Sequence, residues 1–256
     1  MSGELSEQVS TDMRLARLRA ELAQTPSVSN ALREVEIVLP VSRDRVHVLK
    51  PVDADSLLDA SVHDPEQNLP YWAEIWPSGL ALAEAILAHP DRVRGRQVLE
   101  IGSGLGLTAV AALQVGADLT VADYSPESLL LCRYNCLWNT GREPHWLQIN
   151  WRKPSDELFA VAGAGFPVVL AADVLYEWRD VEPLLALADR LVEPGGALWL
   201  AEPGRDPARR FLELAGERGW SESVETFNGP WPDPEDRIVH VAVHLLRRGK
   251  AGDRST

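Results

Sequence analysis

A glycine-rich turn follows a short apolar segment near the middle of the chain, at Val98–Gly106 (Val-Leu-Glu-Ile-Gly-Ser-Gly-Leu-Gly). Residues 98–101 have the length and composition of a buried parallel strand. The small residues after them let the backbone turn sharply and approach a ligand closely. Residues 107–115 resume as a helical pattern that ends at Gly116. This succession predicts a binding site above the carboxyl end of the strand, where free backbone N–H groups point.

The spacing of these glycines differs from the dinucleotide-binding fingerprint, Gly-x-Gly-x-x-Gly. Leu107 stands where that pattern has its third glycine, and a glycine comes one position earlier, at Gly106. Glu100 also precedes the turn, and its charge would repel a pyrophosphate group. The turn therefore favours a ligand with a cationic amino-acid end. On the turn alone, a glycine-rich loop without a ligand is still an open alternative.

The composition is that of an acidic globular protein of moderate size. The 256 residues are 45% hydrophobic and carry a formal net charge of −13, which argues against a general binder of nucleic acids or anionic membranes. No apolar run approaches the roughly 20 residues that cross a membrane, and the first residues lack the basic and apolar regions of a signal peptide. We therefore expect a cytoplasmic protein with no nucleic-acid partner and no membrane span.

Neither the cysteines nor the histidines predict a metal site. Cys132 and Cys136 fall four apart in a helical pattern, but no third cysteine or nearby histidine joins them. Reduced cysteines that fill the core explain this pair better. His240 and His244 fall on one face of an expected strand, and an exposed or edge strand accounts for them without metal.

From residue 97 onwards, strand-like and helical segments alternate, which indicates βαβ units and a parallel sheet with helices on both faces. The last two strand segments, 222–227 and 237–246, leave no room for a crossover helix and must pair antiparallel. The sequence thus predicts an α/β, Rossmann-like doubly wound sheet of seven strands, mostly parallel, with a C-terminal antiparallel hairpin. The expected parallel strands are 97–101, 119–122, 145–149, 168–171 and 197–201, and the expected helices include 127–139 and 181–191.

The residues before this alternation have a different pattern. Residues 1–30 are polar, with leucines spaced for one helical face, so we expect a loosely attached helix or a partly disordered arm. Two strands, 35–39 and 45–49, follow, and a polar irregular segment precedes a helix over 80–88 with Ser78 as its candidate cap. We divide the chain into an N-terminal extension (1–69), a ligand-binding domain (70–248) and a disordered tail (249–256).

Polar residues at the ends of the strands form the candidate site, because ligands of open α/β sheets bind outside the carboxyl ends of the strands. Asp123 ends the second strand, and its carboxylate can accept hydrogen bonds from both hydroxyls of a ribose; a helix cap is the alternative. Asn150 and Trp151 end the third strand, where they would bind and cover an adenine, although a core position explains Trp151 nearly as well. Asp173 follows the fourth strand after two alanines, whose small side chains leave space for a nucleoside.

These residues resemble those of a known family. Glu100-Ile-Gly-Ser-Gly-Leu-Gly106, Asp123 and the closing hairpin look like a class I, seven-stranded S-adenosylmethionine-dependent methyltransferase. Asp173-Val-Leu-Tyr176 matches the Asp-x-x-Tyr motif of the family-16 methyltransferases, which include protein-lysine methyltransferases and are often labelled nicotinamide N-methyltransferase-like. The segment 70–79 (Pro-Tyr-Trp-Ala-Glu-Ile-Trp-Pro-Ser-Gly) is similar to the one before the first core helix of those enzymes. The resemblance covers about residues 70–246.

The resemblance implies S-adenosyl-L-methionine as the cofactor. Glu100 matches the acidic motif residue near the methionine end, and Asn150 stands beside the adenine, where the family often has an aspartate. Asp173 and Tyr176 match the pair near the methyl acceptor, to which the resemblance assigns the catalytic role. The other implied cofactor contacts are Trp76, Gly102, Ser103, Gly104, Asp123, Trp151 and Ala172.

The chemistry of an amine acceptor adds a constraint of its own. A lysine amine with an ordinary pKa near 10.4 is mostly protonated at neutral pH, and populating its neutral form costs about 4–5 kcal/mol. A dry pocket lowers that pKa, whereas a nearby carboxylate raises it. We expect Asp173 to orient the incoming amine and Tyr176 to supply a hydrogen bond and an aromatic wall. A helix cap for Asp173 and core packing for Tyr176 are the alternatives.

The expected activity is methyl transfer to an amine nitrogen, with a protein lysine as the favoured acceptor. A small-molecule amine is the nearest alternative, and a cofactor-binding module without turnover is an alternative of another class. An NAD-dependent dehydrogenase fits less well because of the glycine spacing. Aromatic faces favour cations, and the tryptophans expected to border the pocket are Trp72, Trp76, Trp151 and Trp178.

Overall fold

The computed structural model describes residues 2–25, 28, 32–53, 57–58, 64–66 and 68–249. Parts of the segment 51–69 and residues 250–256 of the expected tail lie outside these residues. No helix in the described part of the chain is long and apolar enough to span a membrane.

Seven strands form one sheet in the order β5-β4-β3-β6-β7-β9-β8, which confirms the predicted fold class. Strands β5, β4, β3, β6 and β7 are parallel, whereas β9 pairs antiparallel with both β7 and β8. Crossover helices therefore lie between the parallel strands, and the chain closes with a hairpin. The strands are β3 (Gln97–Ile101), β4 (Asp118–Asp123), β5 (His145–Gln148), β6 (Phe166–Ala172), β7 (Val192–Glu202), β8 (Ser221–Phe227) and β9 (Val241–Arg247).

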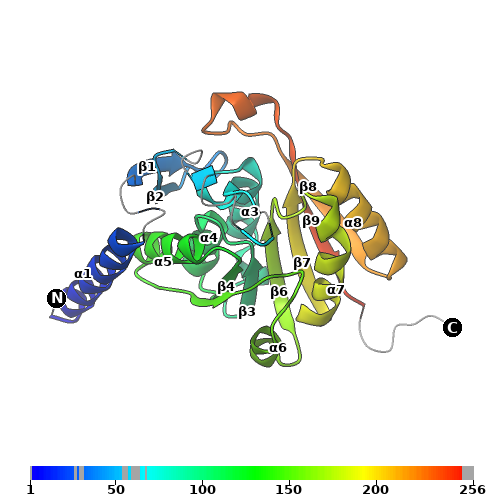
Figure 1. The fold of residues 1–256 in the computed structure, drawn as a ribbon, viewed down its shortest axis with the longest axis horizontal. Helices are drawn as coiled ribbons and strands as arrows, with labels where there is room; N and C mark the ends of the chain where they lie inside the picture. The colour runs from blue at the N-terminus through cyan, green and yellow to red at the C-terminus, as the bar shows by residue number, and fades with distance from the viewer. Residues whose placement is uncertain are drawn as a thin grey trace.

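Different helices cover the two faces of the sheet (Figure 1). One buried cluster joins the sheet to α3, α4 and α5, and a second joins it to α6, α7 and α8. This is the two-sided burial that the apolar strands require. The helices are α3 (Pro77–Ala88), α4 (Leu107–Gln114), α5 (Pro126–Thr140), α6 (Asp156–Ala162), α7 (Val181–Leu191) and α8 (Asp206–Glu217), with short 3-10 turns η2 (Tyr71–Ala73), η3 (Pro90–Arg92), η4 (Trp178–Asp180) and η5 (Pro234–Ile238).

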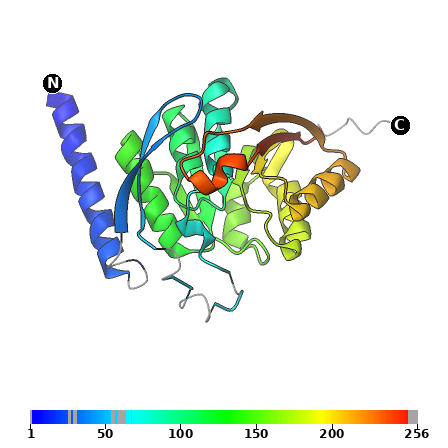
Figure 2. The ribbon, with the colours of Figure 1, turned by 90° about the horizontal axis from the view of Figure 1, so that it is seen from above.

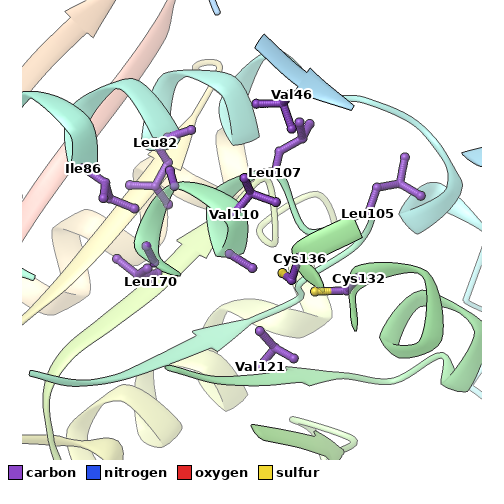
Figure 3. Close-up of a cluster of buried hydrophobic side chains, with 14 of the residues drawn as sticks. Val46, Leu82, Ile86, Leu105, Leu107, Val110, Val121, Cys132, Cys136 and Leu170 are labelled. Carbon is purple, nitrogen blue, oxygen red and sulfur yellow. The ribbon is translucent and has the colours of Figure 1, made fainter. Parts of the chain in front are cut away.

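Two cysteines of α5 are part of the first cluster. Cys132 and Cys136 are fully buried free thiols, and Figure 3 shows them among aliphatic side chains such as Leu107 and Val121. Burial raises the pKa of Cys136 well above its usual value, which keeps the thiol neutral and unreactive. The prediction that these cysteines fill the core is confirmed.

The N-terminal residues form a helix and a hairpin that pack beside α5. Helix α1 (Ser2–Gln24) runs along one side of the molecule next to the hairpin of β1 (Leu32–Val38) and β2 (Arg45–Pro51) (Figure 2). Leu18 and Leu22 of α1 are fully buried, and α1 contacts α5. The expectation of a loosely attached arm is therefore wrong for this half of the helix, because its leucines belong to the main core.

Two local expectations are also wrong. Helix α3 starts at Pro77 with Trp76 as its N-cap, and Ser78 is a buried residue of its first turn rather than a cap. Strand β9 begins at Val241 instead of residue 237, because Pro234–Ile238 form η5, whose first turn is capped by the Asp233 side chain.

Candidate functional site

A pocket lies at the carboxyl ends of β3, β4, β5 and β6, where the sequence places the candidate site. It is closed on one side by the segment before α3, which contributes Tyr71 and Trp72. The predicted residues that line it are Trp76, Gly102, Gly104, Asp123, Asn150, Trp151, Ala172, Asp173 and Tyr176. The fold thus brings together residues that lie up to 100 positions apart in the chain.

The glycine turn after β3 depends on the absence of side chains. Gly102 and Gly104 adopt φ angles of 72° and 50°, which L side chains rarely accept. A Cβ atom on Gly102 would lie 2.7 Å from Cγ1 of Val174. The backbone at this turn can therefore pass close to the loop after β6, leaving room for a ligand only on the pocket side.

Asp123, the last residue of β4, presents a buried carboxylate to this turn. Its Oδ2 accepts a hydrogen bond from the Gly104 N–H at 3.0 Å, and its Oδ1 accepts one from the Ser125 N–H at 3.0 Å. Burial raises the pKa of Asp123, although these backbone hydrogen bonds oppose the rise. The carboxylate also lines the pocket, where a ligand with hydroxyl donors can reach it.

Glu100 and Ser103 are not part of the pocket lining. Both are buried beside the turn, and Glu100 Oε2 and Ser103 Oγ have no hydrogen-bond partner among the described residues. Burial, followed by the neighbouring Cys132 and Asp123, raises the pKa of Glu100 well above its usual value. The expected contact of Glu100 and Ser103 with the cofactor stays a prediction, and neither residue lines the pocket.

Aromatic rings border the pocket. Trp76 donates its indole N–H to the Tyr71 carbonyl at 2.8 Å, and the Tyr71 ring makes edge contacts with Trp76 and Tyr176. Tyr71 was not identified from the sequence, although it lies in the quoted segment 70–79. Trp178 does not line the pocket and is 63% exposed. The expectation for Trp178 is wrong because its side chain, at the first residue of η4, is exposed and does not line the pocket.

Arg152 holds the segment before η2 over the pocket. Its guanidinium forms an ion pair with the fully buried Asp180 (Nε to Oδ1, 2.7 Å), and it reaches Glu66 and Asn68 through Nη1. The Trp151 indole N–H donates to the same Asp180 oxygen at 2.7 Å. These contacts fix the Trp151 ring and the pocket wall together.

Asp173 follows β6 in a left-handed conformation (φ 54°), which costs a non-glycine residue about 1 kcal/mol or more and often marks a functional site. Its Oδ1 accepts a hydrogen bond from Arg205 Nε at 2.9 Å, and its Oδ2 accepts one from the Ser78 hydroxyl at 3.3 Å. Burial raises the pKa of the nearby Tyr176 above its usual value, so its hydroxyl stays protonated. Sequence reasoning missed Arg205 and assigned Ser78 a capping role.

The histidines do not form a metal site, and the described residues contain no cluster of three or more His, Cys, Asp or Glu side chains that could hold an ion. His244 is buried on β9, an inner strand, between Glu202 and Glu222. The expectation of an exposed or edge strand is therefore wrong for His244. His240 lies just before β9 and contacts Asn228.

A family model for lysine methyltransferases matches residues 62–217. The chain belongs to the lysine methyltransferase family. The match covers the pocket segment before α3, the glycine turn, Asp123 and the Asp173–Tyr176 motif, so the family resemblance proposed from the sequence is confirmed.

Relatives of this lysine methyltransferase family member include the electron transfer flavoprotein beta subunit lysine methyltransferase of Rattus norvegicus, 46% identical over 53% of this chain and 51% of the relative. Histone-arginine methyltransferase METTL23 of Homo sapiens is 32% identical over 49% of this chain and 67% of the relative. The chain spans just over half the length of the lysine methyltransferases it matches.

Among solved structures, magnesium protoporphyrin IX methyltransferase (ChlM) from Synechocystis PCC 6803 with bound SAM aligns with a TM-score of 0.51 at 15% identity. The alignment covers 70% of this chain and 88% of that one. At this sequence identity the structural similarity supports the fold alone.

Proposed function

We propose that the chain transfers a methyl group from S-adenosyl-L-methionine to a side-chain nitrogen of a protein, with lysine as the acceptor. The observation that carries this proposal is one pocket lined by the glycine turn, Asp123 and the Asp173–Tyr176 pair. The family match and the names of the relatives support the same assignment. Cytoplasmic location and the absence of a nucleic-acid partner remain predictions from the sequence.

The residues of the pocket fit the proposed cofactor. The Asp123 carboxylate lines the pocket and is an acceptor suited to ribose hydroxyls, and the indole of Trp151 offers a face for an adenine. Glu100 Oε2 and Ser103 Oγ, beside the expected amino-acid end, are buried polar atoms without a hydrogen-bond partner among the described residues. When bound, the cofactor supplies a methyl group that its sulfonium has already activated.

The protein's own contribution is then mainly alignment. An in-line displacement needs a neutral nitrogen held close to the methyl group, and Asp173 is placed to accept an N–H of the acceptor and to orient its lone pair. The protonated Tyr176 hydroxyl and the edge of Tyr71 form the wall beside it. Neither Asp173 nor Tyr176 has to act as a strong base, because solvent can take the proton.

The deciding experiment incubates the protein with methyl-labelled S-adenosylmethionine and a heat-treated cell extract. Label in a protein band, located on lysine by mass spectrometry, supports the proposal. Label on arginine would favour the second candidate, which the METTL23 relative suggests. Label only in a low-mass fraction would contradict a protein acceptor and favour a small-molecule amine. If the protein binds the cofactor but transfers no methyl group, it is a cofactor-binding module rather than an enzyme.

Cofactor choice is tested separately by calorimetry. We expect S-adenosylhomocysteine to bind and NAD not to bind, because Leu107 replaces the third glycine of the dinucleotide fingerprint. The proposed limits are 1–69 for the extension and 70–248 for the catalytic domain. They are tested by the stability of a fragment that contains residues 70–248 alone.

A further inference from the structure

Arg205 contacts Asp173 from outside the pocket. Its Nε donates to Asp173 Oδ1 at 2.9 Å, in an ion pair whose carboxylate side chain is only 8% exposed. Asp173 lines the pocket, whereas Arg205 is not among the described residues that line it. The guanidinium, whose side chain is 38% exposed, therefore contacts the carboxylate without lining the pocket itself.

The loop that carries Arg205 is fixed by Glu202, the last residue of β7. Glu202 Oε2 accepts hydrogen bonds from the Gly204 and Arg205 backbone N–H groups at 2.6 and 3.0 Å, and its Oε1 lies 3.2 Å from His244 Nε2. Burial opposes ionisation of Glu202, but the hydrogen bonds from His244 and Gly204 outweigh it and lower its pKa. The backbone of Arg205 is thus fixed at the start of α8 by an ionised, buried carboxylate, while its side chain is partly exposed.

The other contacts of Asp173 among the described residues come from uncharged or acidic groups. Helix α3 contributes the Ser78 hydroxyl and η5 contributes Asp236, while Tyr176 lines the same pocket. Burial, followed by Asp233, Glu235 and Asp173, raises the pKa of Asp236, so the carboxylates of η5 add negative potential at this end of the pocket. Among these described neighbours of Asp173, Arg205 carries the positive charge that offsets this negative potential.

The charge of Asp173 has two opposite consequences for an amine acceptor. The carboxylate orients the amine by accepting an N–H, but an isolated carboxylate also favours the ammonium form, which has no lone pair to react. A guanidinium, which stays charged at all relevant pH values, cancels the second effect without removing the hydrogen-bond acceptor.

We propose that Arg205 is a positioning residue that neutralises Asp173, so that the carboxylate orients the acceptor amine without holding it in the protonated, unreactive form. This inference rests on the proposed function, because it requires an amine acceptor beside Asp173.

The test compares the pH dependence of kcat/KM for the wild type, Arg205→Gln and Arg205→Lys between pH 6.5 and 10, with methyl-labelled S-adenosylmethionine and a heat-treated cell extract as the acceptor pool. We expect Arg205→Gln to shift the rising limb upward by about one pH unit. It then loses about tenfold at neutral pH, and the loss shrinks as the pH approaches the pKa of the bound amine, because a growing fraction of the amine is then neutral. Arg205→Lys restores most of the wild-type profile.

Two controls separate this effect from a loss of structure. Arg209→Gln removes another arginine of α8, which pairs with Asp206 on the surface, and should leave the profile unchanged. Calorimetric titration with S-adenosylhomocysteine should give the same affinity for Arg205→Gln as for the wild type.

An Arg205→Gln profile that is unshifted, or lowered equally at every pH, would overturn the inference while leaving the proposed function intact. A wild type that binds the cofactor but methylates no amine would overturn both, because no acceptor would then exist for Arg205 to influence.

Discussion

Among the three acidic residues that line the pocket, Asp123 and Asp173 have surroundings that suit them to different partners. Asp123 is held by backbone N–H groups, which fix its oxygens but leave it unneutralised. Asp173 is held by an arginine and a hydroxyl from other elements. A carboxylate fixed by neutral donors suits neutral hydroxyl groups, whereas a carboxylate paired with a cation can orient a nitrogen. We therefore expect Asp123 to serve in binding the cofactor and Asp173 in methyl transfer.

Replacing Asp123 tests the binding role. Asp123→Asn keeps the size of the side chain but removes the charge and one acceptor oxygen. Hydrogen bonds to a charged group contribute about 1.5–3 kcal/mol, so we expect the Kd for S-adenosylhomocysteine to rise about 10–100-fold, measured by calorimetry. An unchanged Kd would mean that the ligand lies elsewhere.

Replacing Asp173 tests the transfer role. Asp173→Asn is preferred to alanine, because asparagine also accepts the left-handed backbone conformation. Misplacing the acceptor is expected to lower kcat about 100-fold and to leave the affinity for S-adenosylhomocysteine within about twofold. Glu177→Gln, which alters a neighbouring carboxylate outside the pocket lining, is the matched control. Equal losses of turnover and affinity in Asp173→Asn would contradict the assigned role.

Glu100 makes stability depend on pH. Its folded-state pKa is raised, so its contribution to stability is complete below its unfolded pKa, about 4.3, and is lost as the pH rises through the folded value. The free energy of unfolding should fall in this window by up to about 1.4 kcal/mol per pH unit relative to Glu100→Gln. Denaturant unfolding of the wild type and Glu100→Gln at pH 5, 6, 7 and 8 measures this difference in the free energy of unfolding. If the free energies of the two proteins change with pH in the same way, Glu100 is not buried as a protonated acid.

Some of these features could be predicted from the sequence and others could not. The strands and the glycine turn were found because apolar runs and glycines are local signals, and Asp123 and Asp173 were found because each directly follows a strand. The Arg205–Asp173 contact joins the ends of two neighbouring strands, β6 and β7, so it depends on strand order as well as on local pattern. The start of β9 was misplaced because Ile238 and Val239 continue its apolar pattern, while the Asp233 cap decides the local structure.

At the scale of the elements, the pocket is assembled by short connections held by side chains. Arg152 joins the loop after β5 to the N-terminus of α7 through Asp180 and to the segment before η2 through Glu66. Tyr124, after β4, donates its hydroxyl to Asp64 of that same segment. The wall before η2 is therefore tied to two strand ends and should move little as long as these contacts persist.

Arg152→Ala tests this connection. It leaves the fully buried Asp180 without its ion-pair partner, and an uncompensated buried charge costs about 3–5 kcal/mol. Lys153→Ala is the matched control, because its ion pair with Glu66 is largely exposed and contributes less than about 1 kcal/mol. Denaturant unfolding of both variants gives the comparison; equal losses would mean that Asp180 finds another partner.

At the scale of the whole molecule, one buried side chain joins the N-terminal hairpin to the glycine turn after β3. Asn135 of α5 accepts a hydrogen bond from the Leu49 N–H at 2.8 Å and donates from Nδ2 to the carbonyls of Leu49 and Leu105. Leu49 belongs to β2, and Leu105 lies within the glycine turn. Asn139, one turn later, pairs with the backbone of His47 in the same way but at a more exposed position.

This arrangement predicts that a change in α5 alters both folding and ligand binding. Asn135→Ala leaves buried backbone groups of Leu49 and Leu105 without partners, at a cost of about 3 kcal/mol in unfolding free energy, and it frees the turn that faces the ligand. We expect the Kd for S-adenosylhomocysteine to rise together with the loss of stability. Asn139→Ala should cost less than about 1 kcal/mol and leave the Kd unchanged, because solvent can replace its bonds and it does not touch the turn. If Asn135→Ala lowers stability but not affinity, the hairpin and the turn are joined in structure without being coupled in function.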